Sequence, residues 1–443
     1  MSAHIRGGGR AGSYTQVSDH LPRSGLRFRG PLMRTDGTSA SAEHCAGPTL
    51  TLGVEEEFVL LDRSDGRPVD RAPAILVLLG GEPRVKAEFL RYQLETVTGV
   101  CTDLGQVGEE LARSRRLAAC AATELDCHLV ATGMAPQRGP GQCPVTADPR
   151  YLQVVARYGS LAAGPGTCGC HVHVGVPSRE LGVRVLARLR PYLATLLALS
   201  VNSPVADGRD TGWASSRYLR WTRWPSAVPP RVWRSAAAYD ATVRRLILRG
   251  DALDERGVYF HARLSPRYPT VEVRIMDVCL TVEDTTLVAG LARALVALAI
   301  DDERRGVPVR VISGRRIAAE LRAAARHGLV AHAVDPYTGV LVPHHLLADA
   351  VLDRLPEPEP IAGLLRCLAF AVRVPTDSAR CWPGPTRRSA SPSSSPRRPS
   401  GESAPSTDRA WRLAPGAHRA GRDGACAAAH LRPPTDSTPR QCR

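Results

Sequence analysis

Two glutamates that are two residues apart are the first side chains whose spacing indicates chemistry. Glu55 and Glu57 lie in LTLGVEEEFVLLD, residues 50–62, where apolar residues alternate as in a β-strand. Alternation places both carboxylates on one face of the strand, about 7 Å apart. Such a pair needs a cation when it is buried, and Mg²⁺ prefers oxygen ligands of this kind. The alternative is a solvated acidic face. Glu56 falls on the apolar face, and the sequence assigns it no role.

Two histidines in CGCHVHVG, residues 168–175, form the second candidate. His171 and His173 share a strand face, where they could bind a metal or phosphate. A hydrogen-bonded pair at the sheet surface is the alternative. Cys168 and Cys170 alternate onto the valine face, and their spacing is not the usual Cys-x₂₋₄-Cys of a zinc site. We therefore interpret these cysteines as packing residues.

An acid and a base are paired in TVEVRIMDVCL, residues 270–280. Glu272 and Arg274 share one face of this expected strand, and apolar residues fill the other. On the functional interpretation, a metal-binding carboxylate lies beside a guanidinium that contacts phosphate oxygens. On the alternative interpretation, this is an ordinary half-exposed sheet surface.

Arginine and tryptophan alternate through the loop-like stretch 202–225, which contains NSP, GRDTGWASSR and WTRWP. Arg209, Arg217 and Arg223 are candidates for binding a substrate carboxylate. The tryptophans could stack on a base.

The basic residues are almost all arginine, and Lys86 is the single lysine among 58 basic residues. Lys86 follows no glycine-rich loop, so neither a Walker-A site nor a protein-kinase site can be built. The net charge of +15 is concentrated towards the ends: arginines outnumber acids 12 to 5 in residues 375–443, and 6 to 3 in residues 1–48. We therefore expect no nucleic-acid partner.

We expect strands and helices to be mixed along the chain, without a regular β-α-β alternation. The predicted strands are 50–62, 89–99, 128–136, 168–177 and 270–280, and the predicted helices are 104–126, a segment from 178, 231–249, 283–300 and 315–327. This order favours an α+β fold with an antiparallel or mixed sheet and helices on one side.

The composition predicts one large folded domain over residues 49–374. Residues 1–48 lack apolar periodicity and are expected to be a disordered leader. Residues 375–443 are expected to be a disordered tail rich in Pro, Ser and Arg, a pattern that a frameshift would produce. Neither a membrane span nor a secretory signal is expected, and the 12 cysteines are read as reduced thiols of a cytoplasmic protein.

Several motifs occur together in an order that resembles the carboxylate–amine ligases of the glutamate–cysteine ligase type 2 family. They are GVEEEF (53–58), ETVTG (95–99), CGCHVHVG (168–175), NSP (202–204), GRDTG (208–212), RWP (223–225) and SPRYPTVEVR (265–274) followed by Asp277. That family is similar in fold to glutamine synthetase. The resemblance implies an antiparallel sheet that forms a funnel, with acidic residues and metal inside and helices on the outer face.

The implied reaction uses ATP and Mg²⁺ to join two amino-acid substrates. A substrate γ-carboxylate attacks the γ-phosphate of ATP, and an amine then displaces phosphate from the acyl phosphate. Glutamate and cysteine, giving γ-glutamylcysteine, are the substrates that the family name implies. No residue serves as a covalent nucleophile.

The resemblance also implies roles for individual residues. Arg274 and Glu57 would be catalytic, and the metal ligands and the substrate or ATP ligands would be two further sets. The metal set is Glu55, Glu57, Glu95, His171 and Glu272; the substrate and ATP set is His173, Arg209, Arg217 and Arg223. The chain departs from the family pattern at His261, where an acidic residue is expected, and the resemblance fades after about Leu365.

Other interpretations remain open at this point. A phosphotransferase of the same fold would stop after phosphoryl transfer, and a catalytically impaired remnant would bind only nucleotide or metal. A zinc-dependent nucleic-acid protein is a more distant alternative. A homo-oligomer is compatible with the sequence.

Overall fold

The computed structural model describes residues 50–139, 144–308 and 310–355. The expected leader, residues 1–48, and the expected tail, residues 375–443, lie outside the described residues. Of the expected domain, Thr49, residues 140–143, residue 309 and residues 356–374 also lie outside them. No helix within the described ranges has the length and apolar character needed to cross a membrane.

One antiparallel sheet of seven strands carries the fold. Its strands lie in the order β2-β3-β1-β5-β9-β8, and β4 pairs with the second half of β1. The bounds are β1 Leu52–Asp62, β2 Val85–Ala87, β3 Gln93–Val97, β4 Cys127–Val130, β5 Gly169–Gly175, β8 Ala262–Leu264 and β9 Thr270–Asp277. The predicted antiparallel sheet is therefore confirmed. Two further hairpins are separate from it: β6 Val205–Ala206 with β7 Arg209–Asp210, and β10 His332–Val334 with β11 Leu341–Pro343.

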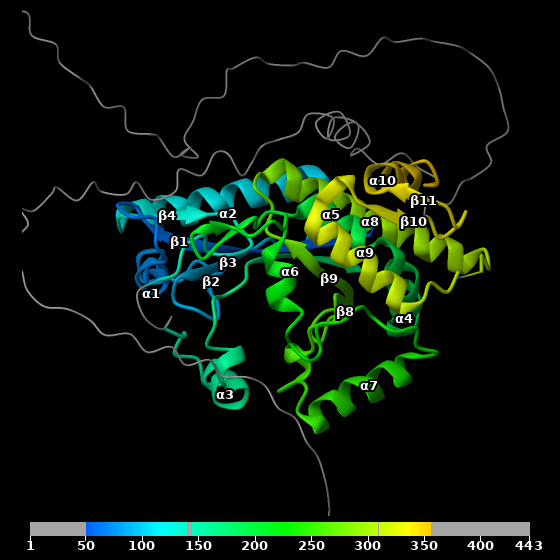
Figure 1. The fold of residues 1–443 in the computed structure, drawn as a ribbon, viewed down its shortest axis with the longest axis horizontal. Coiled ribbons are helices and arrows are strands. Elements are labelled where there is room, and N and C mark those ends of the chain that lie inside the picture. The colour runs from blue at the N-terminus through cyan, green and yellow to red at the C-terminus, as the bar shows by residue number, and fades with distance from the viewer. Residues whose placement is uncertain (1–49, 140–143, 309, 356–443) are drawn as a thin grey trace, which may run out of the picture. The chain divides into compact units, whose positions relative to one another are not determined.

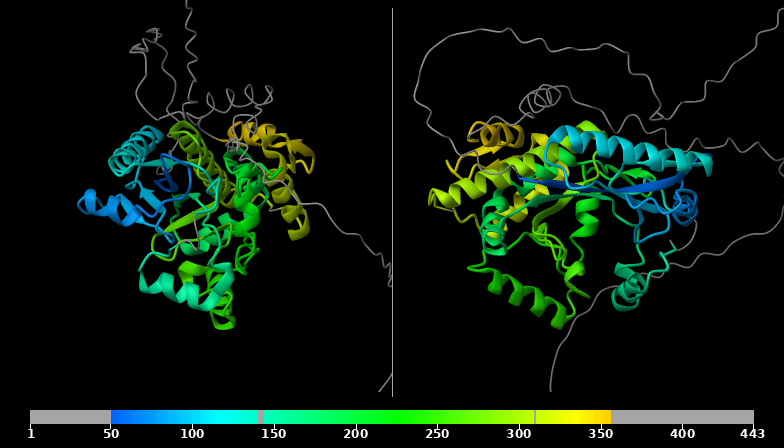
Figure 2. Two further views of the ribbon diagram at one scale, coloured as in Figure 1. Left: turned by 60° about the vertical axis from the view of Figure 1, so that its left-hand side comes forward. Right: turned by 180° about the vertical axis from the view of Figure 1, so that it is seen from behind.

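Long helices cover one face of the sheet, as the alternation of polar and apolar residues requires. Figures 1 and 2 show α2 and α8 on this face, with α3 and α7 on the opposite side. The helices are α1 Ala72–Leu78, α2 Leu104–Glu124, α3 Pro149–Tyr158, α4 Arg179–Leu189, α5 Leu193–Ser200, α6 Ser216–Trp221, α7 Ala236–Arg249, α8 Val282–Arg304, α9 Gly314–His327 and α10 His344–Leu352.

Side-chain caps begin the covering helices where the sequence changes from strand to helix. Asp103, Ser178 and Thr281 have extended backbone, and their side chains accept a backbone N–H from the first turn of α2, α4 and α8. Each cap directs its helix back across the sheet.

The main hydrophobic core lies between this sheet face and the covering helices. Val54 of β1, Val172 of β5 and Val273 of β9 are buried there with residues of α2, α4, α5 and α8. Cys170 is buried in the same core, and the six cysteines of the described residues are free thiols. The predicted packing role of Cys170 agrees with this position. Charged side chains of the same strands lie on the opposite face of the sheet.

Glu56, to which the sequence assigned no role, forms a buried ion pair on the helix-covered face. Arg115 of α2 donates to both oxygens of the Glu56 carboxylate, at 2.9 and 2.6 Å, and Thr285 of α8 donates at 2.6 Å. Arg115 also donates to the backbone oxygens of Cys279 and Leu280. The carboxylate of Glu56 therefore links β1 to both α2 and α8 by hydrogen bonds.

Replacing Arg115 tests this link, because Glu56 is fully buried and would lose its counter-charge. We expect Arg115→Met to lower the free energy of unfolding in urea by about 3–5 kcal/mol. The control is Arg305→Met, which breaks an exposed ion pair with Asp301 and should cost less than about 0.5 kcal/mol. Equal effects of the two substitutions would contradict the assigned role.

Candidate active site

A cavity of about 320 Å³ lies over the charged face of the sheet. Side chains that line the cavity come from residues paired across neighbouring strands. Glu57 lies opposite Glu95, Glu55 opposite His171, and His173 opposite Glu272. This volume is in the range of small-molecule sites. These six residues, all assigned to the site from separate sequence motifs, therefore line one cavity, as do Arg217 and Arg274.

Glu55, His171 and Glu272 form the first group that could hold a metal ion. One ligand atom from each lies within 4.8 Å of the other two. Nδ1 of His171 lies 3.2 Å from Glu55, and Nε2 of His173 lies 3.5 Å from the same carboxylate. Burial alone would raise the pKa of Glu55, but the hydrogen bonds from both histidines hold it below its usual range. Burial, followed by the charge of Arg274, lowers the pKa of His171 to about 4, so its ring is neutral at pH 7.

Glu57, Glu88 and Glu95 form a second group with the same close spacing of ligand atoms. Burial, followed by the charge of Glu88, raises the pKa of Glu57 to about 8. Burial and the neighbouring carboxylates likewise raise the pKa of Glu95 well above its usual range. Three such carboxylates cannot all ionise without a cation between them.

Glu88 was missed by the sequence analysis. It directly follows β2, so no strand alternation assigns it to a face. The structural signal is the β2–β3 hairpin, whose register pairs Lys86 with Glu95 and returns the chain beside β1. A hairpin assignment for residues 85–97 would have been needed to find it.

The two groups fit Mg²⁺ by the chemistry of their ligands. Together they present five carboxylates and one neutral imidazole, the oxygen-rich set that hard divalent ions bind. Neither group contains a cysteine, so the described residues provide no support for a zinc site built on Cys168 and Cys170.

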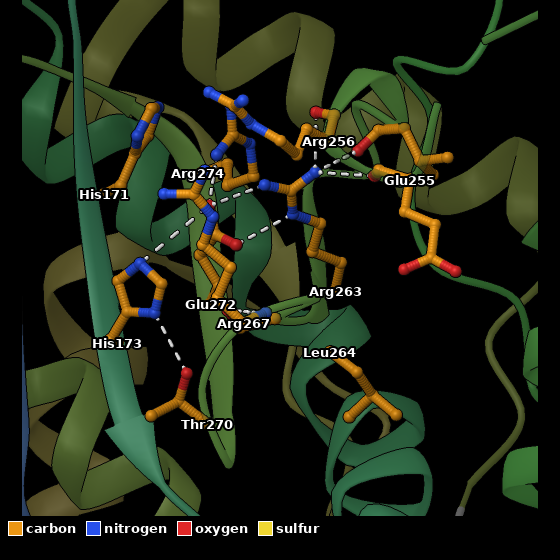
Figure 3. Close-up of polar contacts among 12 residues, drawn as sticks. His171, His173, Glu255, Arg256, Arg263, Leu264, Arg267, Thr270, Glu272 and Arg274 are labelled. Carbon is orange, nitrogen blue, oxygen red and sulfur yellow. Dashed lines mark hydrogen bonds and ion pairs between the residues drawn. The ribbon is translucent and has the colours of Figure 1, made fainter. Parts of the chain in front are cut away.

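Two arginines converge on Glu272 of the first group, as Figure 3 shows. Arg263 donates to both carboxylate oxygens, at 2.8 and 3.2 Å, and Arg274 donates to one of them. Burial alone would raise the pKa of Glu272, but these two guanidinium groups hold it well below its usual range. Arg263 also donates to the backbone oxygens of Glu255, Arg256 and Val258. Two guanidinium groups therefore share one carboxylate, and Arg263 also anchors them to the backbone of residues 255–258.

A β-bulge brings Arg274 to the cavity. The register between β5 and β9 shifts between Cys170 and Val172, so that Arg274 and Ile275 together lie opposite the single residue His171. Ile275 remains in the apolar core. The bulge gives β9 one extra residue at this point. Arg274 stays on the same face of the strand as Glu272.

The three arginines proposed as carboxylate ligands have different positions. Arg209 lies exposed in the small β6–β7 hairpin, and Arg223 lies exposed after the end of α6; neither lines the cavity. Arg217 does line it, but its side chain is buried and donates to the backbone oxygens of Arg274 and Ile275 at 3.3 and 3.1 Å. The structure therefore does not bring Arg209 or Arg223 to the site, and Arg217 supports the strand that carries Arg274.

The loop beginning at Asn202 also supports β9. Asp277 at the end of that strand is buried and accepts hydrogen bonds from the Asn202 backbone, the Ser203 hydroxyl and the Ser215 hydroxyl. Ser203 in turn accepts the backbone N–H of Arg217. The NSP motif is thus a structural clamp in this chain.

His261, where the family pattern led us to expect an acid, lies buried next to this clamp. Its ring stacks on Trp221 with centroids 5.2 Å apart. Burial lowers the pKa of His261 to about 3, so the residue is neutral at pH 7. The position carries an aromatic packing role here, and the neighbouring Trp221 lines the cavity.

The family model described as "Glutamate-cysteine ligase family 2 (GCS2)" matches residues 51–358. The chain belongs to this family. Its members are ATP-dependent ligases that form C–N bonds between a carboxylate and an amine, which confirms the class of enzyme that the motifs implied.

Curated relatives agree with the family assignment. A protein of Salinispora tropica named "Putative glutamate–cysteine ligase 2" is 45% identical over 303 residues, covering 68% of this chain and 80% of that protein. A protein of Mycobacterium sp. (strain KMS) named "Putative glutamate–cysteine ligase 2-2" is 43% identical over 286 residues, covering 64% and 78%.

A solved structure supports the fold. The glutamate–cysteine ligase from Francisella tularensis, in complex with AMP, matches with a TM-score of 0.50 and 13% sequence identity. The match covers 74% of this chain and 82% of that one. At this identity the likeness establishes the shared architecture.

Mg²⁺ binding by the acidic groups is testable without catalysis. At about one hundred times its dissociation constant, Mg²⁺ should stabilise the wild type by about 2.7 kcal/mol, seen as a raised melting temperature. Glu57→Gln keeps an acceptor for the Gly169 N–H but removes the charge, so the Mg²⁺-dependent rise should be largely lost. Glu109→Gln, at an exposed position on α2, should keep it. An undiminished rise in the Glu57 variant would exclude that carboxylate as a ligand.

Proposed function

We propose that this ligase joins the γ-carboxylate of glutamate to the amine of cysteine, using ATP and Mg²⁺. The observation that carries the proposal is one cavity in which two groups of carboxylates face Arg274. The substrate pair is the one in the names of the relatives, and the cavity has the mixed charge that zwitterionic amino acids and a nucleotide require.

The carboxylates would hold Mg²⁺ in two places. Glu55, His171 and Glu272 would form one site, and Glu57, Glu88 and Glu95 the other. When bound, Mg²⁺ would neutralise charge on the phosphates of ATP, which is the main requirement of phosphoryl transfer. The raised pKa values of Glu57 and Glu95 in the absence of a cation reflect the charge that such an ion would balance.

Arg274 would contact the oxygens of the phosphoryl group as it is transferred. Burial alone would lower the pKa of Arg274, but the charge of Glu272 raises it, so the guanidinium stays protonated. The hydrogen bond to Glu272, itself held by Arg263, restricts the guanidinium to one orientation. A preoriented charge stabilises developing charge without a reorganisation cost during reaction.

The reaction would proceed by two displacements. A γ-carboxylate oxygen of glutamate attacks the γ-phosphorus of ATP, and ADP leaves, which gives an acyl phosphate. The amine nitrogen of cysteine then attacks the carbonyl carbon, loses a proton and displaces inorganic phosphate to form the amide. In both displacements the protein binds and orients the substrates and excludes water from them. No side chain forms a covalent bond to substrate.

The substrate pair is tested by a screen of phosphate release from ATP across amino-acid pairs, with the amide product identified by mass. We expect full phosphate release and γ-glutamylcysteine only when glutamate and cysteine are both present. Phosphate transfer that proceeds equally without any amine would favour the phosphotransferase alternative. An absence of turnover with every pair would favour the impaired remnant.

Substitution of Arg274 tests the phosphoryl role. Loss of a comparable arginine lowers the rate by about 10³–10⁵-fold, so Arg274→Ala should be almost inactive. Arg274→Lys keeps the charge but loses the planar fork and should also be strongly impaired. Turnover of purified variants is the measurement, with thermal melting as the folding control. Variants that melt normally and keep activity within about threefold of wild type, under 1 kcal/mol, would refute the role.

A further inference from the structure

Four of the seven arginines that line the cavity lie beside acids of the protein; of the other three, Arg256 and Arg267 are exposed and Arg220 is half-buried. Arg150 forms two hydrogen bonds with Asp254, at 2.6 and 2.9 Å. Arg263 and Arg274 share Glu272. The guanidinium groups of Arg150, Arg263 and Arg274 are therefore already held by acids of the protein.

Arg220 differs from them. It lies on α6, lines the same cavity and is half-buried. Its side chain forms no hydrogen bond or ion pair with another residue in the described part of the chain, and its buried Nη2 is left without a partner. Asp207, the acid whose charge acts on Arg220, is already bound by both arms of Arg138 at 2.5 and 2.8 Å.

The guanidinium of Arg220 packs against Gly164, which also lines the cavity. A Cβ atom built on Gly164 would lie 1.2 Å from Nη2 of Arg220, so the side chain rests directly on the glycine backbone. Two residues on, a Cβ on Gly166 would lie 2.5 Å from Oε1 of Gln93. The absence of side chains at Gly164 and Gly166 leaves room for the guanidinium of Arg220 and the amide of Gln93.

We propose that Arg220 binds the α-carboxylate of one amino-acid substrate and so determines specificity for it. The proposal rests on the proposed function, in which glutamate and cysteine each carry an α-carboxylate that takes no part in the reaction. A half-buried cation without a partner is costly, and a carboxylate matches the planar fork of arginine with two parallel hydrogen bonds. Because Arg220 lies outside both acidic groups, it is not committed to the metal ions.

Decarboxylated substrates provide the test. 4-Aminobutyrate is glutamate without its α-carboxylate, and cysteamine is cysteine without its own. We expect the wild type to prefer the carboxylate-bearing member of one pair by about 30-fold or more in kcat/KM. In Arg220→Gln that preference should fall to within about threefold, while kcat/KM for the decarboxylated member stays near the wild-type value. The pair whose preference collapses identifies the substrate that Arg220 holds.

Two further variants separate binding from structure. Arg223→Gln, three residues away but exposed and outside the cavity, should leave both preferences unchanged. Gly164→Ala should lower the same preference as Arg220→Gln, because the new methyl group displaces the guanidinium. The melting temperature of Arg220→Gln should equal or exceed that of the wild type, since no partner is lost; a clear decrease would indicate a structural role and overturn the proposal.

The remaining outcomes are also decisive. An active wild type, with an Arg220 variant that keeps both preferences or changes only the KM for ATP, would overturn the assignment of Arg220 alone. A wild type that forms no amide from glutamate and cysteine would overturn the proposed function and this assignment together.

Discussion

Antiparallel pairing on both edges of β1 determines where the charged side chains meet. Because β1 lies between β3 and β5, Glu57 is placed opposite Glu95 and Glu55 opposite His171. The period of two along each strand then sends every second residue to the helices and the others to the cavity. A shift of one residue would turn the other face of β1, with Val54, Glu56 and Phe58, towards the cavity. The buried Glu56–Arg115 pair, on the opposite face, adds a specific contact that such a shift would break.

Electrostatic compensation organises the cavity into regions. Burial and the neighbouring carboxylates raise the pKa values of Glu57 and Glu95, which favours a cation bound between them. Glu272 remains ionised because it lies between two guanidinium groups. Arg217 is removed from this balance because it donates to backbone oxygens and lies 3.8 Å from the buried Asp277. The cavity therefore contains two cation-binding groups, two guanidinium groups held by Glu272, and a half-buried arginine, Arg220, with no acidic partner among the described residues.

The sequence analysis found the site residues that lie on long strands, and it missed those on or next to very short strands. Glu55, Glu57, His171, His173, Glu272 and Arg274 all lie on strands, where alternation assigns a face. Glu88 follows a three-residue strand, and Arg263 belongs to another, so neither showed a periodic signal. Arg209 and Arg223 were chosen from a stretch rich in Arg and Trp, but only the fold decides which of its arginines face the cavity. Glu56 broke the apolar pattern because its partner lies 59 residues away, on a helix whose packing the local sequence does not specify.

The pairing of β5 with β9 joins parts of the chain that are distant in sequence. Glu55 and Glu272, which belong to one group of ligand atoms, are 217 residues apart. Contacts of such separation are slow to form because the intervening chain must be ordered first. During synthesis on the ribosome, Glu55 and Glu57 of β1 lack the cavity residues that β9 supplies until β9 has emerged. The nascent chain therefore passes through most of its translation before it can hold a metal or a nucleotide, and a product truncated before β9 would lack Glu272 and Arg274 altogether.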